Sequence, residues 1–301
     1  MQKSTKWFLG IFAFIAIFVL GVIGFIAFAF VNVGEYTEEE ISGSGQKIAV
    51  VEVVGPIYSS EEEVRQLKKY RKDNSIKAIL LHVNSPGGGV AASQEIYEAV
   101  KRTNEEKPVI VSMSSLAASG GYYISCGARK IVANPGTLTG SIGVISQFWQ
   151  VNKLLDKIGV SNNTIKSGKM KDEGNPFREM TDEERKNFQQ LSDNIHQQFI
   201  SAVESGRNIP HEKLIELADG RVYSGLQAYE NHLIDTLGTY EDAIRITAVE
   251  ANISGEPAIV KEVEKKSLFE RMFGTTLRSV SRVKEELFDQ PVLQYRMPGT
   301  W

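Results

Sequence analysis

The sequence has almost no cysteine, since Cys126 is the only one among 301 residues. An intrachain disulfide is therefore excluded, and so is a zinc cluster built from several thiolates. The sequence also lacks an excess of charge of either sign, with 34 lysines and arginines against 37 aspartates and glutamates and a formal net charge of −3. Because nucleic-acid binding needs a concentrated basic surface, nucleic acid is not expected as a partner. The hydrophobic content of 42% is typical of a folded globular protein.

One long stretch lacks charged residues altogether. Residues 7–31 are uncharged and mostly apolar, and a transmembrane helix needs about 20 such residues. Lys3 and Lys6 precede the stretch and acidic residues from Glu35 onward follow it, so the positive-inside bias places the amino terminus in the cytoplasm and the remainder outside. Residues 27–29 also fit a signal-peptide cleavage site, but the apolar region of a signal peptide has only about 7–15 residues. We therefore expect a retained single-pass anchor.

The remainder of the chain is expected to fold as an α/β protein. Apolar, β-branched runs alternate with helical patterns, and continuously apolar strands are typical of a mostly parallel sheet buried on both faces. The expected strands cover residues 48–54, 78–83, 109–113, 131–133 and 142–148. The expected helices cover residues 61–72, 90–102, 117–126, a long segment from 181 onward, 210–220 and 239–252. The whole chain is therefore expected to divide into four segments. These are a cytoplasmic stub and transmembrane anchor over 1–33, a flexible tether over 34–46, a globular domain over 47–263 and a C-terminal helical tail over 264–301.

Two glycine-containing segments could offer backbone N–H groups to an anion. Asn84–Gly89 lies between an expected strand and an expected helix, and its three consecutive glycines let the backbone approach a ligand closely. In the second segment, Ser119 lies past the end of a strand among small residues and is followed by Gly120. A reachable serine beside such donors fits nucleophilic attack on a carbonyl group. The alternatives are a plain turn and a helix N-cap, and the N-cap is the more frequent use of serine at such a position.

The residue pattern does not identify the group that would accept the serine proton. No local setting marks a catalytic imidazole at any of the four histidines, His82, His196, His211 and His232. Lysine is the alternative base, although an unperturbed pKa of about 10.4 leaves only about one amine in 2,500 neutral near pH 7. Lys166, Lys169 and Lys171 lie close together in a turn-rich stretch, so spacing alone does not choose among them.

These segments resemble a known protein family. The sequence is similar to the signal peptide peptidase A family in five motifs that occur in the family's order, at residues 83–89, 117–123, 138–144, 166–172 and 218–225. The resemblance covers roughly residues 47–238, and each motif occurs once, as in the single-length form of the family. It implies a membrane-anchored serine endopeptidase with a Ser/Lys dyad, in which residues 47–263 form the peptidase domain with a Clp-protease/crotonase-like fold.

The resemblance also implies roles for individual residues. The family's nucleophile falls on Ser119 and its general base on Lys171. The oxyanion donors fall on the backbone N–H groups of Gly88 and Gly120, and the lysine-orienting hydroxyl falls on Ser141. In single-length members a neighbouring subunit supplies the lysine, which implies a ring-like homo-oligomer. Neither a metal nor another cofactor is implied.

The implied substrates are cleaved signal peptides and similar apolar peptides at the lipid membrane. The expected location is the cell membrane, with a cytoplasmic amino terminus and the catalytic domain on the other side. Two alternatives belong to other functional classes. One is a membrane-tethered crotonase-like binder of acyl thioesters, although the sequence contains no obvious adenine-nucleotide site, and the other is a non-catalytic scaffold.

Overall fold

The computed structural model describes residues 36–264 and 293–297, together with Trp7 and Leu20. The expected anchor over 1–33 lies outside the described residues, apart from those two single positions. Within the described part, no helix is both long enough and apolar enough to cross a bilayer. The elements are, in chain order, β1 (Tyr36–Ser42), β2 (Lys47–Val54), α2 (Glu61–Lys72), β3 (Ile76–Ser85), β4 (Gly87–Gly89), α3 (Val90–Glu106), β5 (Val109–Ala118), α4 (Gly120–Ser125), β6 (Lys130–Ala133), β7 (Leu138–Gly140), α5 (Asn152–Lys157), α6 (Asp182–Arg207), α7 (His211–Leu217), β8 (Val222–Ser224), α8 (Gly225–Glu230), β9 (Thr236–Leu237), α9 (Tyr240–Glu250), β10 (Ala258–Glu264) and β11 (Gln294–Arg296).

The chain divides into two compact units. One consists of Met1–Glu39 and Lys261–Asp289, and the other of Glu40–Val260 and Gln290–Trp301. The second unit contains nearly all of the helices and strands named above, and it contains every residue of the candidate site discussed below.

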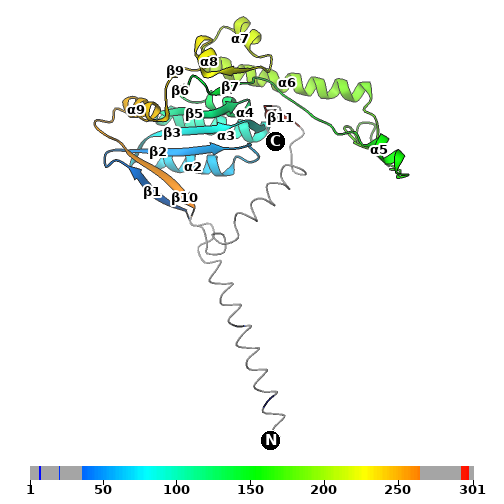
Figure 1. Cartoon of the computed structure of the whole chain (residues 1–301), viewed down its shortest axis with the longest axis horizontal. Coiled ribbons are helices and arrows are strands. Elements are labelled where there is room, and N and C mark those ends of the chain that lie inside the picture. Colours follow the sequence, from blue (N-terminus) through cyan, green and yellow to red (C-terminus); the bar gives the residue numbers. More distant parts are fainter. Residues whose placement is uncertain (1–6, 8–19, 21–35, 265–292, 298–301) are drawn as a thin grey trace. The chain divides into compact units, whose positions relative to one another are not determined.

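A nine-stranded, mostly parallel sheet confirms the predicted α/β class, and seven of its strands, β2, β3 and β5 to β9, lie wholly in the second unit. Its order is β1-β10-β2-β3-β5-β6-β9, with β7 paired to β5 and to β8. The pairs from β2 through β3, β5 and β6 to β9 are parallel, as is the pair β5–β7. Figure 1 shows these strands with the helices packed around them.

The apolar strands are buried on both faces, as their continuous hydrophobic sequences predicted. Side chains of one face pack with α2, α3, α4 and α6 in one core cluster, and those of the other face pack with α9 in a second. Along β3, for example, Ile79 and Leu81 belong to the first cluster and Ala78 and Leu80 to the second. The carboxyl ends of β3, β5 and β7 are therefore held rigidly by a core on each side, and the candidate site lies there.

Helix boundaries agree with the sequence where local signals are strong. The helix expected over 61–72 is α2, with the same bounds. A capping box begins α6, in which the Thr181 hydroxyl accepts the Glu184 N–H and the Glu184 carboxylate accepts the Thr181 N–H. The helix expected over 117–126 is wrong at its start, because β5 extends to Ala118 and pairs there with β7.

Three segments differ from expectation because their partners are distant in sequence. Residues 142–148, expected as a strand, form a single bridge in which Ile145 pairs with Gln294. Residues 36–42, expected within a flexible tether, form β1 at the edge of the sheet beside β10. Residues 294–296, expected within a helical tail, form β11, whereas residues 265–292 of that tail lie outside the described residues.

Candidate active site

A glycine strand, β4, presents one backbone N–H group to the place that residues 294–296 fill, here called the cleft. The turn into it is set by Gly87, whose φ of 91° suits glycine and whose N–H donates to the Ser85 hydroxyl (3.1 Å). On one side, the Ile57 N–H donates to the Gly87 carbonyl (2.9 Å) and the Gly89 N–H to the Ile57 carbonyl (2.8 Å). Because backbone groups alternate in direction along a strand, the N–H of Gly88 points to the opposite side.

Ser119 lies at the next sheet edge, between β5 and α4. Its φ of 53° and ψ of −116° are sparsely populated for a residue with a side chain, and such a conformation costs about 1–3 kcal/mol. The N–H of Ser119 donates to the Gly140 carbonyl (2.7 Å), which holds this conformation. Although Ser119 occupies the N-cap position, its side chain makes no capping bond and no other hydrogen bond among the described residues, and the residue is only 1% exposed. The N-cap alternative therefore does not explain this serine.

Ser141 comes directly after β7, and β7 pairs with β5, the strand that ends just before Ser119. The register pairs Ala118 with Gly140 in parallel strands, so Ser119 and Ser141 leave the same sheet edge side by side. Ser141 is also buried and also has a positive φ, of 51°, and its N–H donates to the Arg221 carbonyl (2.9 Å). Two buried hydroxyl-bearing residues are thus held in unusual backbone conformations at one place.

The two glycine segments adjoin each other at the cleft. A Cβ atom on Gly87 would lie 2.5 Å from the Gly120 nitrogen and 1.9 Å from the Tyr295 carbonyl oxygen. A Cβ atom on Gly120 would lie 3.0 Å from the same oxygen and 2.6 Å from the Ser93 hydroxyl. The Gly120 N–H begins α4, where backbone donors have no partner inside the helix. The absence of side chains here lets a carbonyl group approach donors from both segments.

A strand of the chain itself, β11, occupies this cleft. It pairs antiparallel with β4, with Tyr295 opposite Gly88, and Figure 1 shows it next to α4. Because the Met297 N–H donates to the Pro86 carbonyl (2.9 Å) and hydrogen-bonded pairs alternate along an antiparallel ladder, the Tyr295 carbonyl faces the Gly88 N–H. On the other side, Gln294 exchanges two hydrogen bonds with Ile145 (3.0 and 3.1 Å).

The three candidate lysines differ in their contacts. Lys166 donates to the Lys169 carbonyl (2.8 Å) and pairs with Asp172, and Lys169 pairs with Glu183. Lys171 is exposed, and within the described part of the chain its side chain has neither an ion pair nor a hydrogen bond. It is therefore the one of the three whose amine is not engaged in holding the loop together.

The loop that carries Lys171 is tied to α6 through Arg178. The Arg178 guanidinium donates to the Asp172 carboxylate (2.9 Å), to the Asp172 carbonyl (2.8 Å) and to Glu184 (2.9 Å). Hydrogen bonding to Arg178 lowers the pKa of Glu184 to about 2. Arg178, followed by Lys166, also lowers the pKa of Asp172 below its usual range.

We expect this loop to loosen in acid. Both carboxyl groups have lower pKa values in the folded loop than in an unfolded chain, where that of Glu184 is near 4.5. Their ion pairs therefore stabilise the loop fully above about pH 5, and this contribution is lost as the pH falls towards 2. Hydrogen exchange of residues 166–184, corrected for the intrinsic rate at each pH, should show less protection at pH 2.5 than at pH 6. An Arg178→Met variant should be poorly protected at both values, and equal protection of the unmodified chain at both would contradict the prediction.

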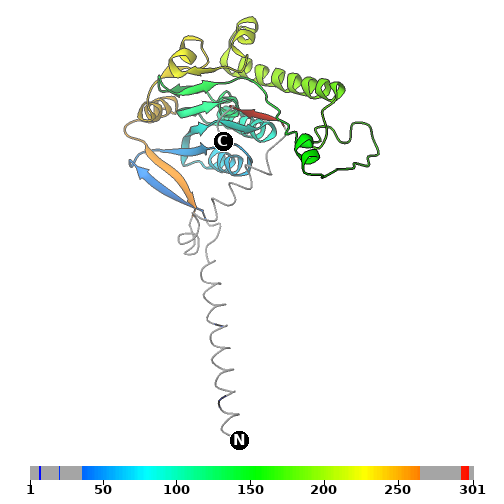
Figure 2. The same ribbon diagram turned by 45° about the vertical axis from the view of Figure 1, so that its right-hand side comes forward.

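Within the second unit, the structure does not bring Lys171 to Ser119. The loop of Lys171 is anchored at Glu184 near the start of α6, whereas Phe199, further along α6, packs against Tyr123 and Tyr295 beside the cleft. Fifteen helical residues separate these anchor points, or about 22 Å at 1.5 Å per residue. Figures 1 and 2 both show α5 and its flanking loops at the end of α6 that lies away from α4.

Other reactive side chains of the chain are its four histidines and its single cysteine. The Ser119 hydroxyl has no hydrogen-bond partner in the described part of the chain, so none of the four histidines is bonded to it. Among residues 36–264 and 293–297 there is no group of three or more His, Cys, Asp or Glu side chains placed to hold a metal ion. The single thiol, Cys126, is buried, and burial raises its pKa to about 12.

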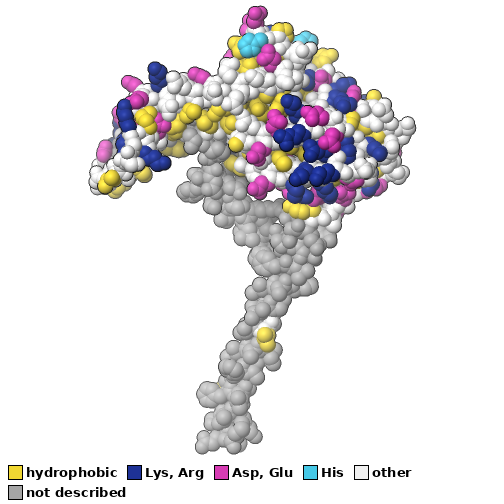
Figure 3. Space-filling model, turned by 180° about the vertical axis from the view of Figure 1, so that it is seen from behind, with side chains coloured by type: hydrophobic (Ala, Val, Ile, Leu, Met, Phe, Trp, Pro, Cys, Tyr) yellow, Lys and Arg dark blue, Asp and Glu magenta, His cyan; other side chains and the backbone are white. Residues whose placement is uncertain are grey.

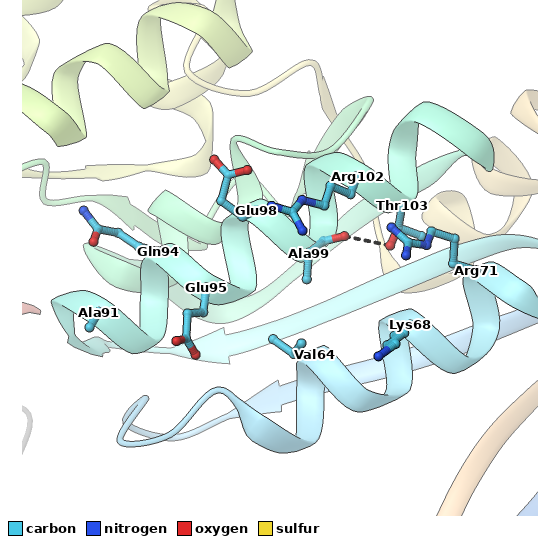
Figure 4. Close-up of a pocket in the computed structure, with 10 residues that line it drawn as sticks. All are labelled: Val64, Lys68, Arg71, Ala91, Gln94, Glu95, Glu98, Ala99, Arg102 and Thr103. Atoms are coloured by element: carbon cyan, nitrogen blue, oxygen red, sulfur yellow. Dashed lines mark hydrogen bonds between the residues drawn. The ribbon is translucent and has the colours of Figure 1, made fainter.

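A cavity of about 850 Å³ lies elsewhere, between α2 and α3 (Figure 4). It is lined by Val64, Lys68, Arg71, Ala91, Gln94, Glu95, Glu98, Ala99, Arg102 and Thr103. Its glutamates, Glu95 and Glu98, lie towards one end and its basic side chains, Lys68, Arg71 and Arg102, towards the other (Figure 4), and it includes none of the five predicted site residues. Its size alone therefore does not make it the candidate active site.

Sequence reasoning did not find the aromatic residues around the cleft or the strand that fills it. Tyr97, Tyr123 and Phe199 come from α3, α4 and α6 and form one cluster with Tyr295. Tyr123 follows Ser119 by one helical turn, which was the only local signal. Tyr97 and Phe199 occupy positions typical of the buried face of a helix, so their sequence gives no sign of a site. Only the tertiary fold places their rings beside Tyr123 and Tyr295.

The chain is similar to two family profiles and to several known proteins. A profile of Peptidase family S49 matches residues 101–254, and a Clp protease profile matches residues 46–139. A "Putative protease" from Synechocystis is 42% identical over 231 residues, covering 76% of this chain and 83% of its own. A "Putative signal peptide peptidase SppA" from Enterococcus faecium is 40% identical, covering 71% of this chain and 67% of its own. A solved ClpP1 mutant from Listeria monocytogenes aligns with 64% of this chain and 93% of its own, with a TM-score of 0.45 and 18% identity.

Proposed function

We propose, from the premise that the chain belongs to Peptidase family S49 and is a serine peptidase, that Ser119 is its nucleophile and Lys171 its general base. The observation that carries this proposal is the Ser119 hydroxyl, which is buried, unpartnered and held in a costly backbone conformation beside the glycine strand. Functional groups held in this way are typical of active sites, where the surrounding fold stabilises strain that serves the reaction.

In the proposed reaction, the neutral amine of Lys171 accepts the Ser119 proton as the serine oxygen attacks the scissile carbonyl carbon. The N–H groups of Gly88 and Gly120 donate to the oxyanion, and each such donor is worth roughly 10²–10³-fold in rate. The protonated lysine then gives its proton to the leaving amine, and water hydrolyses the acyl-enzyme in the reverse sequence of transfers. The Ser141 hydroxyl orients the lysine beside Ser119.

We propose that a second copy of the chain supplies Lys171. The anchor points of the two groups lie too far apart for one side chain to bridge them within a compact unit. The arm, residues 149–180, also carries an exposed set of apolar side chains, namely Trp149, Leu154, Ile158, Val160, Ile165 and Phe177. Figure 3 shows hydrophobic side chains on the surface of this part, interspersed with basic and acidic ones. Exposed apolar sets of this kind mark contact surfaces, and repetition of one such contact from copy to copy closes a ring.

The substrates that we propose are cleaved signal peptides and similar apolar peptides. The support is the apolar, aromatic lining of the cleft together with the uncharged stretch over residues 7–31. Such a stretch would anchor the enzyme in the cell membrane, with the amino terminus in the cytoplasm and the peptidase domain on the other side. An anchored enzyme meets peptides that remain in the bilayer.

A serine-directed covalent probe tests the nucleophile directly. A fluorophosphonate should label the full-length protein in detergent, and mass spectrometry of the digest should place the label on Ser119. The Ser119→Ala variant should not be labelled, whereas Ser125→Ala should be labelled normally, because the Ser125 hydroxyl donates to the Gly121 carbonyl (2.7 Å) inside α4. Labelling of a different serine, or of none, would contradict the assignment.

A further inference from the structure

One of the five motifs found in the sequence has no part in the proposed reaction. Each of the other four contains a predicted site residue, whereas residues 218–225 contain none. This 218–225 segment runs from the end of α7 through β8 to the first residue of α8. Strand β8 pairs antiparallel with β7, and β7 pairs on its other side with β5, which ends beside Ser119. A single strand therefore separates the segment from the candidate nucleophile.

One peptide group connects the 218–225 segment to Ser119. The Ser141 N–H donates to the Arg221 carbonyl (2.9 Å), and the Gly140 carbonyl accepts the Ser119 N–H (2.7 Å). This donor and this acceptor belong to the same trans peptide group, between Gly140 and Ser141, and there they point in opposite directions. The hydrogen bonds therefore form one chain from Arg221 to Ser119, and bonds in such a chain strengthen one another.

The backbone on both sides of this chain needs support. Gly140, Ser141 and Ser119 have φ values of 73°, 51° and 53°, and residues with side chains rarely adopt such values. A rotation of the Gly140–Ser141 peptide plane would break both hydrogen bonds at once. The Arg221 carbonyl opposes this rotation, so it helps to keep the two serines side by side at the sheet edge.

A turn at Asp219 sets the direction of the Arg221 carbonyl. The Asp219 carboxylate accepts the Arg221 N–H (3.1 Å) and the Arg221 Nε–H (2.8 Å). Gly220 lies between them with a φ of 88°, so the three residues form a turn closed by the aspartate side chain. Both side chains are largely exposed, and an ion pair at the surface contributes little to stability. The bond to the backbone N–H, which shapes the turn, is therefore the important contact of Asp219.

Tyr223 fixes the same peptide group through Gly140. The tyrosine is buried, and its hydroxyl donates to the Leu217 carbonyl at the end of α7 (3.0 Å). It lies opposite Thr139 in the pairing of β8 with β7. Its ring covers Gly140, since a Cβ atom on Gly140 would lie 2.6 Å from the ring carbon Cδ2. The ring therefore limits movement of the residue that precedes Ser141.

We infer that Asp219 and Tyr223 are positioning residues of the candidate active site, which hold the Gly140–Ser141 peptide group in the orientation that keeps Ser119 and Ser141 in place. Asp219 acts through the Arg221 carbonyl, and Tyr223 acts through its packing on Gly140. The effect on catalysis rests on the proposed function, because it requires Ser119 to be the nucleophile. The effect on the two serine N–H groups does not depend on any reaction.

The kinetics of single variants provide the first test. A displacement of about 1 Å at a reacting group can cost 10²-fold in rate, so Tyr223→Leu, which removes the ring from Gly140, should lower kcat on that order. Asp219→Ala should lower kcat about tenfold through the loss of one hydrogen bond. Asp219→Asn should restore most of this loss, because an amide oxygen can also accept the Arg221 N–H. KM should change less than about twofold, because Ile57 holds the glycine strand β4 from its other side.

Tyr229→Leu is the matched control for the tyrosine. Tyr229 lies on the neighbouring helix α8 and is 45% exposed, so this variant should keep its kcat. A fluorophosphonate separates poor positioning from unfolding. It should label Tyr223→Leu and Asp219→Ala to the same final extent as the unmodified full-length protein in detergent, but more slowly. An unchanged kcat in Tyr223→Leu, equal losses in Asp219→Ala and Asp219→Asn, or losses explained by a smaller labelled fraction would overturn the inference.

Hydrogen exchange at single residues tests the positioning without catalysis. In the inactive Lys171→Ala background, mass spectrometry with electron-transfer fragmentation should show the Ser119 and Ser141 N–H groups exchanging about tenfold faster in Asp219→Ala and in Tyr223→Leu. Both groups should remain slow in Asp219→Asn and in Tyr229→Leu. If these changes are found but the unmodified chain cleaves no peptide, the peptidase assignment fails and the positioning role stands. Unchanged exchange at either serine in Asp219→Ala and Tyr223→Leu would overturn the inference.

Discussion

Replacing Ser119 by alanine is expected to abolish peptide hydrolysis, with a loss of at least about 10³-fold in kcat, because the variant lacks the hydroxyl that forms the acyl-enzyme. The variant should remain folded, since the serine hydroxyl makes no hydrogen bond among the described residues that alanine would break. Hydrolysis of an apolar peptide and thermal unfolding should be measured on the same preparation. Normal turnover by Ser119→Ala would remove Ser119 from the mechanism.

Ser119→Gly is the matched control for the backbone at this position. Glycine tolerates a φ of 53° without steric cost, so this variant should be as inactive as Ser119→Ala but more stable than it. The expected gain is about 1 kcal/mol, reduced from the full strain by the greater entropy of glycine in the unfolded chain. A glycine variant less stable than the alanine variant would show that the conformation at Ser119 is not strained.

Replacing Lys171 by alanine is expected to cause the second large loss, again at least about 10³-fold, because the serine then has no proton acceptor. Lys169→Ala is the matched control, since Lys169 lies two positions away and pairs with Glu183 at the surface. It should retain substantial activity. Lys166 is a poor control, because its removal would disturb Asp172 and the loop itself. Comparable losses of activity in the Lys169→Ala and Lys171→Ala variants would indicate that activity depends on the structure of the loop and not on the amine of Lys171.

Mixing the two inactive variants tests where the lysine comes from. If each site combines Ser119 of one copy with Lys171 of another, co-expression of Ser119→Ala and Lys171→Ala chains should restore about a quarter of the sites by random assembly. A contact between copies would also remove the amine from water, which favours its neutral, proton-accepting form. Mixed assemblies without any recovery would mean that both groups act within one chain, through a movement of the arm.

Features predicted correctly from the sequence depend on neighbours along the chain. The parallel α/β class follows from continuous apolar strands such as β2 and β3, which need two covered faces whatever their partners are. The start of α6 follows from Thr181 and Glu184, which bond each other across one helical turn. The family resemblance likewise uses short motifs whose residues are close together in sequence, and the profile match over residues 101–254 confirms it.

The roles of Ser119, Lys171, Gly88, Gly120 and Ser141 remain predictions, but the structure gives each a physical setting. Four of them lie at one edge of the sheet, because β3, β5 and β7 are neighbours there. The residue pattern left Ser119 open to interpretation as an N-cap, since a sequence does not show whether a hydroxyl makes its capping bond. It also left three lysines equivalent, and only their carboxylate partners distinguish them.

By itself, the sequence determined the α/β class with its mostly parallel central strands, most helix starts and the family, because hydrophobic periodicity, capping and motif spacing act over a few residues. The tertiary structure alone decided that Ser119 is strained and unpartnered among the described residues. It also decided that the loop of Lys171 is tied to α6 at Glu184, about 22 Å along the helix from Phe199, and that the ring of Tyr295 packs among other aromatic rings. Each of these three features depends on contacts between segments that are far apart in sequence. Local residue patterns do not indicate which distant segment a given segment will contact.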